Sequence, residues 1–349
     1  MSNQSLNKIN IGWDIGGAHI KYCVESDLDD IIWYDVIDFE FWKEYKNLNN
    51  LVKRINTLHS RSNYTIKNYF TMSAEMCDCF ENRDIGIKHI LNEIIRSKCN
   101  SYVFTKHGFV RPDNIKKNYF KDIGSYNWYA SALYISPLYK NAIVIDFGST
   151  SCDFLIIKNH KIYNKRISDL SGLQNKELLY TGCARTPIFS NLHKIKFNNQ
   201  SYTIIPEQFS SMSDIYVILD KLNIRDIYSK SSNGLSHSKL NSYKRLSRSF
   251  GFDYSPSKMR LLRGLSQKIY KDQKNLIHNT ITYHLKKYFK NVDTVNIIAL
   301  GLGHHTIIEI CKKYQYQHVD MNSFLNNDIV NGEYLFHLFP AFVLNRLIK

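Results

Sequence analysis

The stretch from Ala142 to Ile157, which reads AIVIDFGSTSCDFLII, constrains the fold more than any other part of this chain. Two apolar runs flank a polar turn that holds Gly148, Ser149 and Thr150, and Asp146 stands at the end of the first run. We interpret the stretch as two antiparallel strands, because buried strands alternate with turn residues in this way. Glycine lets the backbone approach a ligand closely, and free N–H groups and hydroxyls in a turn form an anion-binding concavity. Asp146 is positioned to hold a metal ion or its water.

The same pattern occurs near the N-terminus. The range 9–24 reads INIGWDIGGAHIKYCV, in which a strand leads to Asp14, then to Gly16 and Gly17, and then to a second strand that carries Lys21. A single hairpin of this kind would be weak evidence for a site. Two of them, one early and one in the middle of the chain, predict two similar lobes that face one ligand.

The composition excludes several classes of protein. The 349 residues allow two domains, and 44% hydrophobic with 22% charged residues is ordinary for a globular chain. No apolar run reaches the ~18 residues of a membrane span, and no apolar signal segment precedes the first strand. We therefore expect a cytoplasmic protein with no membrane partner. The seven cysteines are scattered without metal-ligand spacing, so no zinc or disulfide framework is expected.

The net charge of +15 has two interpretations. It could serve an anionic partner, or it could reflect a composition rich in Lys, Asn, Ile and Tyr. The lysines are dispersed, and neither a basic tail nor a nucleic-acid-binding motif is present. We therefore expect no nucleic-acid partner, and a phosphate-bearing substrate needs only a few of these cations.

The remaining pattern is typical of an α/β protein. A strand at 68–72, an amphipathic helix at 85–99 and a strand at 102–105 alternate in the first part of the chain. A helix at 125–134 is expected to lead into the second lobe. We place the lobes at 1–139 and 140–349, with a helical insertion around 207–290. A late buried strand, 295–302, ends at a glycine-rich turn, which contains Gly301 and Gly303.

Two such hairpins and a late strand with a Gly-x-Gly end resemble the superfamily of acetate and sugar kinases, heat-shock chaperone ATPases and actin. Six motifs in order are more specific: GWDIGGAHIK, TMSAEMCDCFENR, SYNWYASA, VIDFGSTSCD, ELLYTGCARTPI and PEQFSSMSDIY. They resemble the hydantoinase/oxoprolinase-related proteins of tetrahydromethanopterin-linked one-carbon transfer, which include enzymes of methanofuran biosynthesis. The resemblance runs over nearly the whole chain. It implies a two-lobed, actin-like (ribonuclease H-like) α/β fold with a ligand cleft between the lobes.

The resemblance also implies a reaction. A transferase of this family joins an aminomethylfuran diphosphate to a tyramine- or tyrosine-type phenol, forms an aryl ether and releases diphosphate. Its partners are these small molecules, and a homo-oligomer is compatible with the sequence. The main difficulty is the charge on the leaving diphosphate, which metal ions and fixed donors stabilise. We therefore expect Mg²⁺ as cofactor and no requirement for ATP.

Residues suited to these roles follow from the matched motifs. Hard oxygen ligands for Mg²⁺ are expected from Asp14 and Asp146. Lys21 offers a point charge and Arg185 a two-pronged phosphate contact. The phenol, with an ordinary pKa near 10, needs a base. The candidates for that base are Glu75, Glu207 and Asp214. The predicted phosphate-binding residues are Gly16, Gly17, Gly148, Ser149, Thr150, Gly182, Arg185, Thr186, Gly301 and Gly303.

Each assignment has a structural alternative. Lys21 could be a solvated strand residue and Arg185 an ion-pair partner. Glu207 and Asp214 could simply begin a helix, where acidic residues are favoured. His304 and His305 follow a glycine turn, and we expect them at the surface or at the rim of a pocket.

The sequence departs from the family pattern at two places. Ala74 stands where a glycine is expected, and Asn233-Gly234 stands where an Asp-Gly pair is expected. Asparagine keeps a metal-ligating oxygen but loses the charge. Two other functions fit the superfamily. One is an ATP-dependent kinase or a hydantoinase/oxoprolinase-type hydrolase, and the other is a non-catalytic nucleotide switch.

Overall fold

The computed structural model describes residues 7–27, 31–190, 192–319 and 332–348. The chain divides into two compact units, each with its own hydrophobic core. The first unit comprises Met1–Leu138, Ile167–Asp169 and Asn327–Lys349, and the second comprises Tyr139–Arg166 and Leu170–Asn326.

The first unit is built on one six-stranded sheet with the order β3-β2-β1-β4-β5-β6. Its strands are β1 (Asn7–Ile15), β2 (His19–Ser26), β3 (Ile31–Asp38), β4 (Tyr64–Met72), β5 (Ser101–Thr105) and β6 (Gly108–Val110). The first three strands are antiparallel to one another, whereas β4 runs parallel to β1 and β5 parallel to β4. Ile9, Ile11, Trp13 and Ile15 of β1, which alternate along the strand and therefore share one face of the sheet, are all fully buried.

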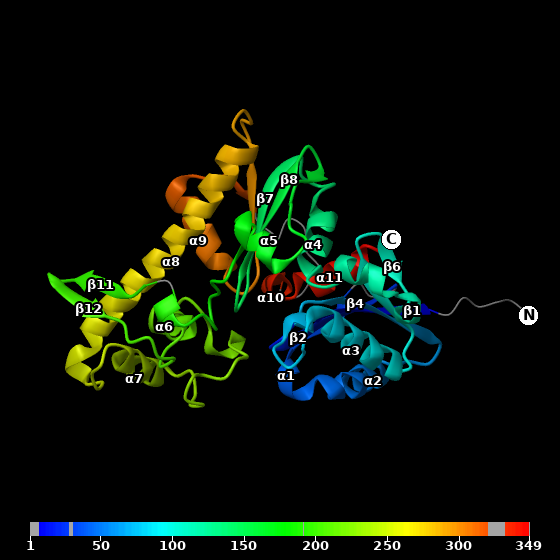
Figure 1. The fold of residues 1–349 in the computed structure, drawn as a ribbon, viewed down its shortest axis with the longest axis horizontal. Coiled ribbons are helices and arrows are strands. Elements are labelled where there is room, and N and C mark those ends of the chain that lie inside the picture. The colour runs from blue at the N-terminus through cyan, green and yellow to red at the C-terminus, as the bar shows by residue number, and fades with distance from the viewer. Residues whose placement is uncertain (1–6, 28–30, 191, 320–331, 349) are drawn as a thin grey trace, which may run out of the picture. The chain divides into compact units, whose positions relative to one another are not determined.

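Helices cover both faces of this sheet (Figure 1). On one face lie α2 (Leu48–Leu58) and α3 (Arg83–Arg96), whose apolar residues recur at helical spacing. The helix α11 (Phe339–Arg346) packs against β1, β2, β4 and α4 (Asn127–Ile135). Gly12 makes this close approach possible, because a Cβ at that position would lie 2.0 Å from the Ala341 carbonyl oxygen.

The second unit repeats the same topology. Its sheet has the order β10-β8-β7-β13-β14, and β9 also pairs with β8. The strands are β7 (Asn141–Phe147), β8 (Cys152–Lys158), β9 (Lys161–Ile162), β10 (Leu178–Leu179), β13 (Asn296–Leu300) and β14 (His318–Val319). Here β7 and β8 are antiparallel, and β13 runs parallel to β7. Strands β9 and β10 both pair antiparallel with β8, so together they take the place of β3. Both sheets have the ribonuclease H-like order of the actin-like fold, which confirms the predicted fold class.

In the sequence, the helical part of the second unit lies between β10 and β13. It contains α6 (Met212–Ile218), α7 (Lys239–Ser249) and the long α8 (Met259–Tyr288), and a hairpin of β11 (Lys194–Phe197) and β12 (Gln200–Thr203) precedes it. Figure 1 shows α8 in yellow, followed by α9 (His304–Tyr314) in orange. A short helix, α5 (Asp169–Gln174), lies between β9 and β10 in the sequence. In the first unit, α1 (Phe41–Glu44) follows β3, and α10 (Gly332–His337) precedes α11.

The end of the chain differs from expectation. We placed residues 140–349 in one C-terminal lobe, but α11 belongs to the first unit. The apolar residues of α11 pack on the central strand of the first sheet, and Asn345 donates a hydrogen bond to the carbonyl of Cys23 at 3.0 Å. The helix before it, α10, ends at His337, and Pro340 lies in the first turn of α11.

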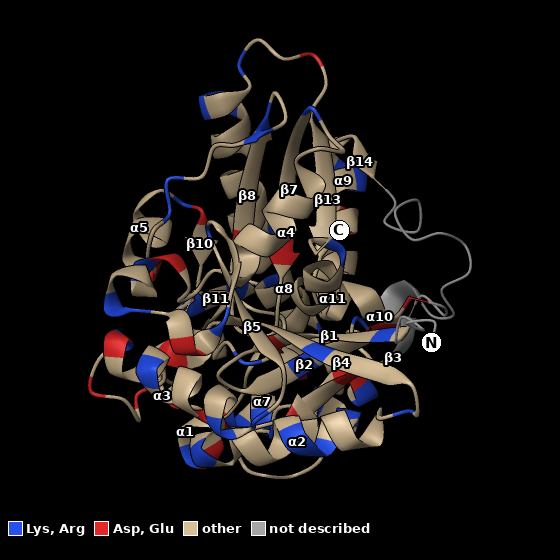
Figure 2. Cartoon of the chain, turned by 90° about the vertical axis from the view of Figure 1, so that its right-hand side faces the viewer, with Lys and Arg blue, Asp and Glu red and all other residues tan. Residues whose placement is uncertain are grey.

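Charged residues are spread over the elements of both units, with Lys and Arg interspersed with Asp and Glu (Figure 2). Among the described residues, no helix has the length and apolarity needed to cross a membrane. Within the same ranges, no group of three or more His, Cys, Asp or Glu residues is arranged to hold a metal ion.

Candidate functional site

In the first unit, Asp14 and Lys21 lie opposite each other on β1 and β2. The Lys21 Nζ atom is 3.5 Å from Asp14 Oδ2, and the Asp14 side chain is only 3% exposed. Asp14 Oδ1 is buried and has no hydrogen-bond partner among the described residues. An ionised oxygen that is buried without a partner is costly, so this atom is suited to receive a cation or a donor from a ligand.

The turn after Asp14 is tight and closely covered. The Gly16 amide donates to the His19 carbonyl at 3.1 Å, and the Ser73 amide donates to the Ile15 carbonyl at 2.9 Å. A Cβ on Gly17 would lie 3.1 Å from Cys77 Sγ. The segment after β4 therefore lies directly against the β1–β2 turn.

Glu75 lies in that covering segment and is completely buried. Its Oε1 atom accepts a hydrogen bond from Ser125 Oγ at 2.6 Å and pairs with Arg83 Nε at 3.3 Å. Arg83 also donates to the carbonyl of Gly124. Burial raises the pKa of the Glu75 carboxyl group, and the Ser125 hydroxyl and Arg83 oppose that effect. These contacts tie the segment to α3 and to the turn before α4.

In the second unit, the β7–β8 turn has the same construction. The Gly148 amide donates to the Ser151 carbonyl at 2.9 Å, three residues on, as Gly16 does to His19. The hydroxyls of Ser149 and Thr150 lie 3.5 Å apart and are half-buried. The duplicated turn predicted from the sequence is therefore present in both units.

Residues 181–186 form a loop that packs against this second turn. The amides of Ala184 and Arg185 donate to the Ser149 carbonyl at 3.2 and 2.8 Å, and the Cys183 amide donates to the Gly148 carbonyl. A Cβ on Gly182 would lie 2.2 Å from the Ser149 carbonyl oxygen. Only glycine allows this approach of two backbones.

Side chains from other elements hold the 181–186 loop in place. The Gly182 amide donates to Thr186 Oγ1 at 2.7 Å, so Thr186 is engaged within the loop. Gln273 of α8 donates from Nε2 to Thr181 Oγ1 and to the Gly182 carbonyl, both at 2.9 Å. Sequence analysis missed Gln273. The available signal was an uncharged amide on the helix face that also carries the buried Ile269 and Ile277.

The glycine turn after β13 completes this region. Gly301 has a φ of +81°, and a Cβ there would lie 2.5 Å from Asp146 Oδ1. The Gly303 amide donates to the Phe147 carbonyl at 2.7 Å. His304 is buried, contrary to our expectation of a surface or rim position. Its Nδ1 lies 3.0 Å from the Gly301 carbonyl oxygen, and burial followed by the neighbouring His305 lowers its pKa to about 4.

Two candidate bases have other surroundings. Asp214 is buried and pairs with Arg245 Nη2 at 2.6 Å, and it forms a capping box with Ser211 at the start of α6. These are the contacts of a structural ion pair and helix cap. Asn233 Oδ1 accepts hydrogen bonds from Ser231, from the Leu235 amide and from Arg245. Its oxygen therefore organises the 231–235 turn.

Glu207 lies on an exposed turn, where its own carbonyl accepts from the Phe209 amide. The second unit thus brings Asp146, the 148–150 turn, the 181–186 loop and the 301–303 turn together. The first unit brings Asp14, the 16–17 turn and Lys21 together, with the segment of Glu75 behind that turn. The catalytic, phosphate and metal roles of these residues stay predictions, as does the cleft between the lobes.

Known proteins resemble this chain in sequence and in fold. A curated protein of Methanocaldococcus jannaschii, (4-{4-[2-(gamma-L-glutamylamino)ethyl]phenoxymethyl}furan-2-yl)methanamine synthase, is 29% identical over 308 residues, which cover 87% of this chain and 89% of the relative. The protein of the same name from Methanococcus vannielii is 27% identical over 214 residues, which cover 60% of this chain and 91% of the relative.

Among solved structures, the ethanolamine utilization protein EutJ from Carboxydothermus hydrogenoformans matches with a TM-score of 0.45 and 9% identity, over 96% of this chain and 89% of that one. A nucleotide-free acetone carboxylase matches with a TM-score of 0.48 and 10% identity, over 86% of this chain and 66% of that one. The sequence profile described as Hydantoinase/oxoprolinase matches residues 68–325. This match spans well over half of the sequence, and the chain therefore belongs to the hydantoinase/oxoprolinase family.

Proposed function

We propose that this protein is a transferase that forms an aryl ether between an aminomethylfuran diphosphate and a tyramine- or tyrosine-type phenol, and that it releases diphosphate without using ATP. The proposal places it in methanofuran or methylofuran biosynthesis. The observation that carries it is the 29% identity with the Methanocaldococcus jannaschii synthase, which extends over 87% of this chain.

The name of that relative describes the bond to be made. A phenoxymethyl group joins a substituted phenol to a furan ring, and the ring also carries an aminomethyl group. In the proposed step, the phenolic oxygen forms a bond to the methylene carbon on the furan. The bond from that carbon to the diphosphate oxygen breaks, and the diphosphate leaves with the electron pair. The phenolic proton passes to a base.

The geometry of the turns suits the leaving group. A furan ring supports positive charge on its methylene carbon, so stabilising the negative diphosphate is the main catalytic task. The half-buried hydroxyls of Ser149 and Thr150 stand on a rigid turn, and Lys21 is a cation beside the other turn. Gly16 and Gly148 add no side chain at the first position of either turn. We propose these groups as the diphosphate contacts.

We propose Mg²⁺ as the cofactor, with Asp14 and Asp146 as ligands, each in its own unit. Asp14 offers a buried carboxylate oxygen without a hydrogen-bond partner in the described part of the chain, and Asp146 is the penultimate residue of the corresponding strand of the second unit. Carboxylate oxygens are the ligands that Mg²⁺ prefers. When bound, the ion would neutralise charge on the diphosphate oxygens.

Glu75 remains a candidate for the base, because burial raises the pKa of its carboxyl group and a carboxylate with a raised pKa accepts a proton more readily. The hydrogen bond from Ser125 and the ion pair with Arg83 occupy Oε1. The buried Oε2 has no hydrogen-bond partner among the described residues. Glu207, which is exposed, is the second candidate.

The decisive experiment follows both products. The purified chain is incubated with the furan diphosphate, tyramine or tyrosine, and Mg²⁺, and the ether and the diphosphate are measured by mass spectrometry and an enzymatic diphosphate assay. We expect one diphosphate for each ether formed, with no change when ATP is added. Asp146→Asn should lose the activity, whereas Asp293→Asn, at an exposed position before β13, should keep it.

Strict dependence on ATP with release of inorganic phosphate would contradict the proposal. That outcome would favour a kinase or a hydrolase of the hydantoinase/oxoprolinase family.

A further inference from the structure

A pocket of about 420 Å³ lies within the second unit, between the outer side of α8 and the last turns of α9. Its volume is in the range of small-molecule sites. The pocket shares no residue with the turns and loops described above. The lining residues are Leu219, Lys221, Arg263, Gln267, Tyr270, Lys271, Lys274, Asn275, Ile310, Lys313 and Tyr314.

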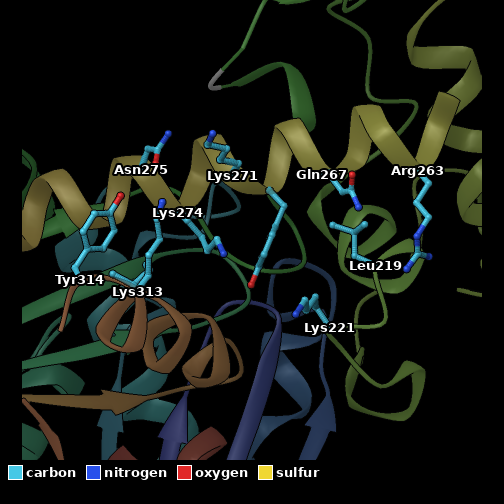
Figure 3. A pocket seen from close by; sticks show the side chains of 11 residues that line it. Leu219, Lys221, Arg263, Gln267, Lys271, Lys274, Asn275, Lys313 and Tyr314 are labelled. Atoms are coloured by element: carbon cyan, nitrogen blue, oxygen red, sulfur yellow. The ribbon is translucent and has the colours of Figure 1, made fainter. Parts of the chain in front are cut away.

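The lining is strongly cationic. Figure 3 shows Arg263 and Lys274 extending from α8, Lys313 reaching from α9 toward α8, and Lys221 approaching from the segment after α6. Lys271 stands at the edge of α8. The lining contains five Lys and Arg side chains and no Asp or Glu.

Nearby carboxylates compensate only part of this charge. Glu309 pairs with Lys221 at 2.5 Å and with Lys274 at 3.0 Å, so one carboxylate serves two ammonium groups. Asp220 lies 3.6 Å from Arg263. Among the described residues, no carboxylate lies within ion-pair distance of Lys271 or of Lys313. A concave wall with excess charge of one sign raises the local concentration of the opposite ion.

The floor of the pocket is fixed. Tyr270 is buried, and its hydroxyl donates to Glu309 at 2.9 Å. The Lys274 ammonium lies 4.6 Å from the centre of the Tyr270 ring, and the Lys313 ammonium lies 4.8 Å from that of Tyr314. These contacts hold both ammonium groups close to aromatic rings. Because the two side chains are already ordered, less conformational entropy is lost when an anion binds. Gln267 and Asn275 add neutral polar groups.

We propose that this pocket is a second anion site, separate from the two hairpin turns, that binds a small compound with several phosphate groups. The separation of Lys221, Arg263, Lys274 and Lys313 over two helices and a connecting segment suits a ligand with more than one charged group. A compound with several phosphates matches the excess charge better than one with carboxylates, because each phosphate carries more charge and more acceptor oxygens.

The test uses the full chain and three probes: inorganic tripolyphosphate, 2,3-bisphosphoglycerate and citrate. Affinities are measured by isothermal titration calorimetry without Mg²⁺. The pocket variant Gln267→Glu/Lys313→Glu lowers the positive charge of the wall and places two carboxylates on it, both at exposed positions. The control Lys268→Glu/Lys312→Glu changes two adjacent exposed residues that do not line the pocket and alters the net charge more. Acetylation of lysines, followed by mass spectrometry, locates the bound probe.

We expect the phosphate probes to bind, and the pocket variant to lose affinity by about 30-fold or more, as reversal of contacts with a multiply charged ion implies. The control should change it by less than about 3-fold. The probes should protect Lys274 and Lys313 from acetylation, but neither Lys268 nor Lys312. Tighter binding of 2,3-bisphosphoglycerate would indicate an organic phosphate as the ligand, and tighter binding of tripolyphosphate would indicate inorganic polyphosphate.

Three results would overturn the proposal. The first is the absence of binding by either phosphate probe. The second is an equal loss of affinity in the pocket and control variants, which would mean that only the bulk charge matters. The third is binding of citrate as tight as that of the phosphate probes, which would remove the assignment to phosphate compounds.

Discussion

The Lys21 ammonium lies 3.5 Å from Asp14 Oδ2, while the other oxygen of this buried carboxylate has no hydrogen-bond partner in the described part of the chain. Only one of the two oxygens of the Asp14 carboxylate is thus paired with a cation. Such a group costs stability, because buried charges are normally paired and hydrogen-bonded, so its presence indicates a role in binding.

We predict that Asp14→Asn reduces ether formation by at least ~100-fold, the scale of losing one charge-stabilising group. Stability should change by less than about 1 kcal/mol, because Lys21 is 29% exposed and can turn to water. Activity is measured by product mass spectrometry and stability by urea unfolding. Asp113→Asn, an exposed acid in the same unit, is the control. Near-normal turnover of Asp14→Asn would make this carboxylate structural.

Two glycine substitutions should differ in their effects on folding. Gly182→Ala would place a Cβ 2.2 Å from the Ser149 carbonyl oxygen and 2.4 Å from the Thr150 amide nitrogen. Because both are backbone atoms, we expect a loss of at least about 2 kcal/mol in the free energy of unfolding. Gly148→Ala meets only the Ser151 carbonyl oxygen at 3.6 Å, so the fold should tolerate it.

The activity of Gly148→Ala then tests whether a ligand needs the bare backbone of that turn. A loss of activity with unchanged stability would support close approach of the ligand. Unchanged activity would remove Gly148 from the phosphate-binding residues.

The Asp214–Arg245 pair gives a prediction that separates structure from catalysis. Asp214→Asn should lower the free energy of unfolding by about 3–5 kcal/mol, because it leaves a buried guanidinium unpaired. The double variant Asp214→Leu/Arg245→Met should be less destabilised than the sum of Asp214→Leu and Arg245→Met made singly. Chemical denaturation of the unmodified chain, these two single variants and the double variant measures this coupling. A variant at Asp214 that is stable yet inactive would instead support a role as the base.

His284 should make the stability depend on pH. It is fully buried, its Nε2 lies 2.7 Å from the Lys176 carbonyl oxygen, and burial lowers its pKa from 6.5 to about 4. Between pH 6.5 and about 4, His284 binds a proton in the unfolded chain but not in the folded chain. The contribution of neutral His284 to the free energy of unfolding is therefore complete above pH 6.5 and is lost as the pH falls toward 4. The full difference corresponds to about 3 kcal/mol.

His284→Gln keeps a donor for the Lys176 carbonyl but cannot titrate. Its free energy of unfolding should vary less between pH 7 and pH 4 than that of the unmodified chain. The exposed His160→Gln serves as the control and should retain the full dependence. Equal slopes for His284→Gln and the unmodified chain would contradict this assignment.

Local patterns predicted much of the fold. The two Asp-bearing hairpins, the helix at 85–99 and the strand before Gly301 were all evident, because alternation and helical spacing are properties of short segments. The pairing of Asp214 with Arg245 was not evident. A capping acid and a helical arginine thirty-one residues later carry no signal of mutual contact. The burial of His304 was missed for the same reason, since the turn that covers it depends on β7 and β13 lying side by side.

The role of α11 could not be predicted either. Its periodicity indicates an apolar face but does not identify the sheet that the face covers. Only the missing side chain of Gly12, 329 residues before Ala341, marks the place where the helix docks.

That docking has a consequence for how the protein is made. β1 leaves the ribosome before the second unit, but the helix that covers it, α11, leaves after the second unit's strands. Domains usually fold in order from the N-terminus during synthesis. Here the first sheet must wait with one apolar face uncovered until α11 has been made, while the second unit has all of its strands earlier. α11 therefore closes the first unit late, and nascent chains stalled before residue 339 should need a chaperone to stay in solution.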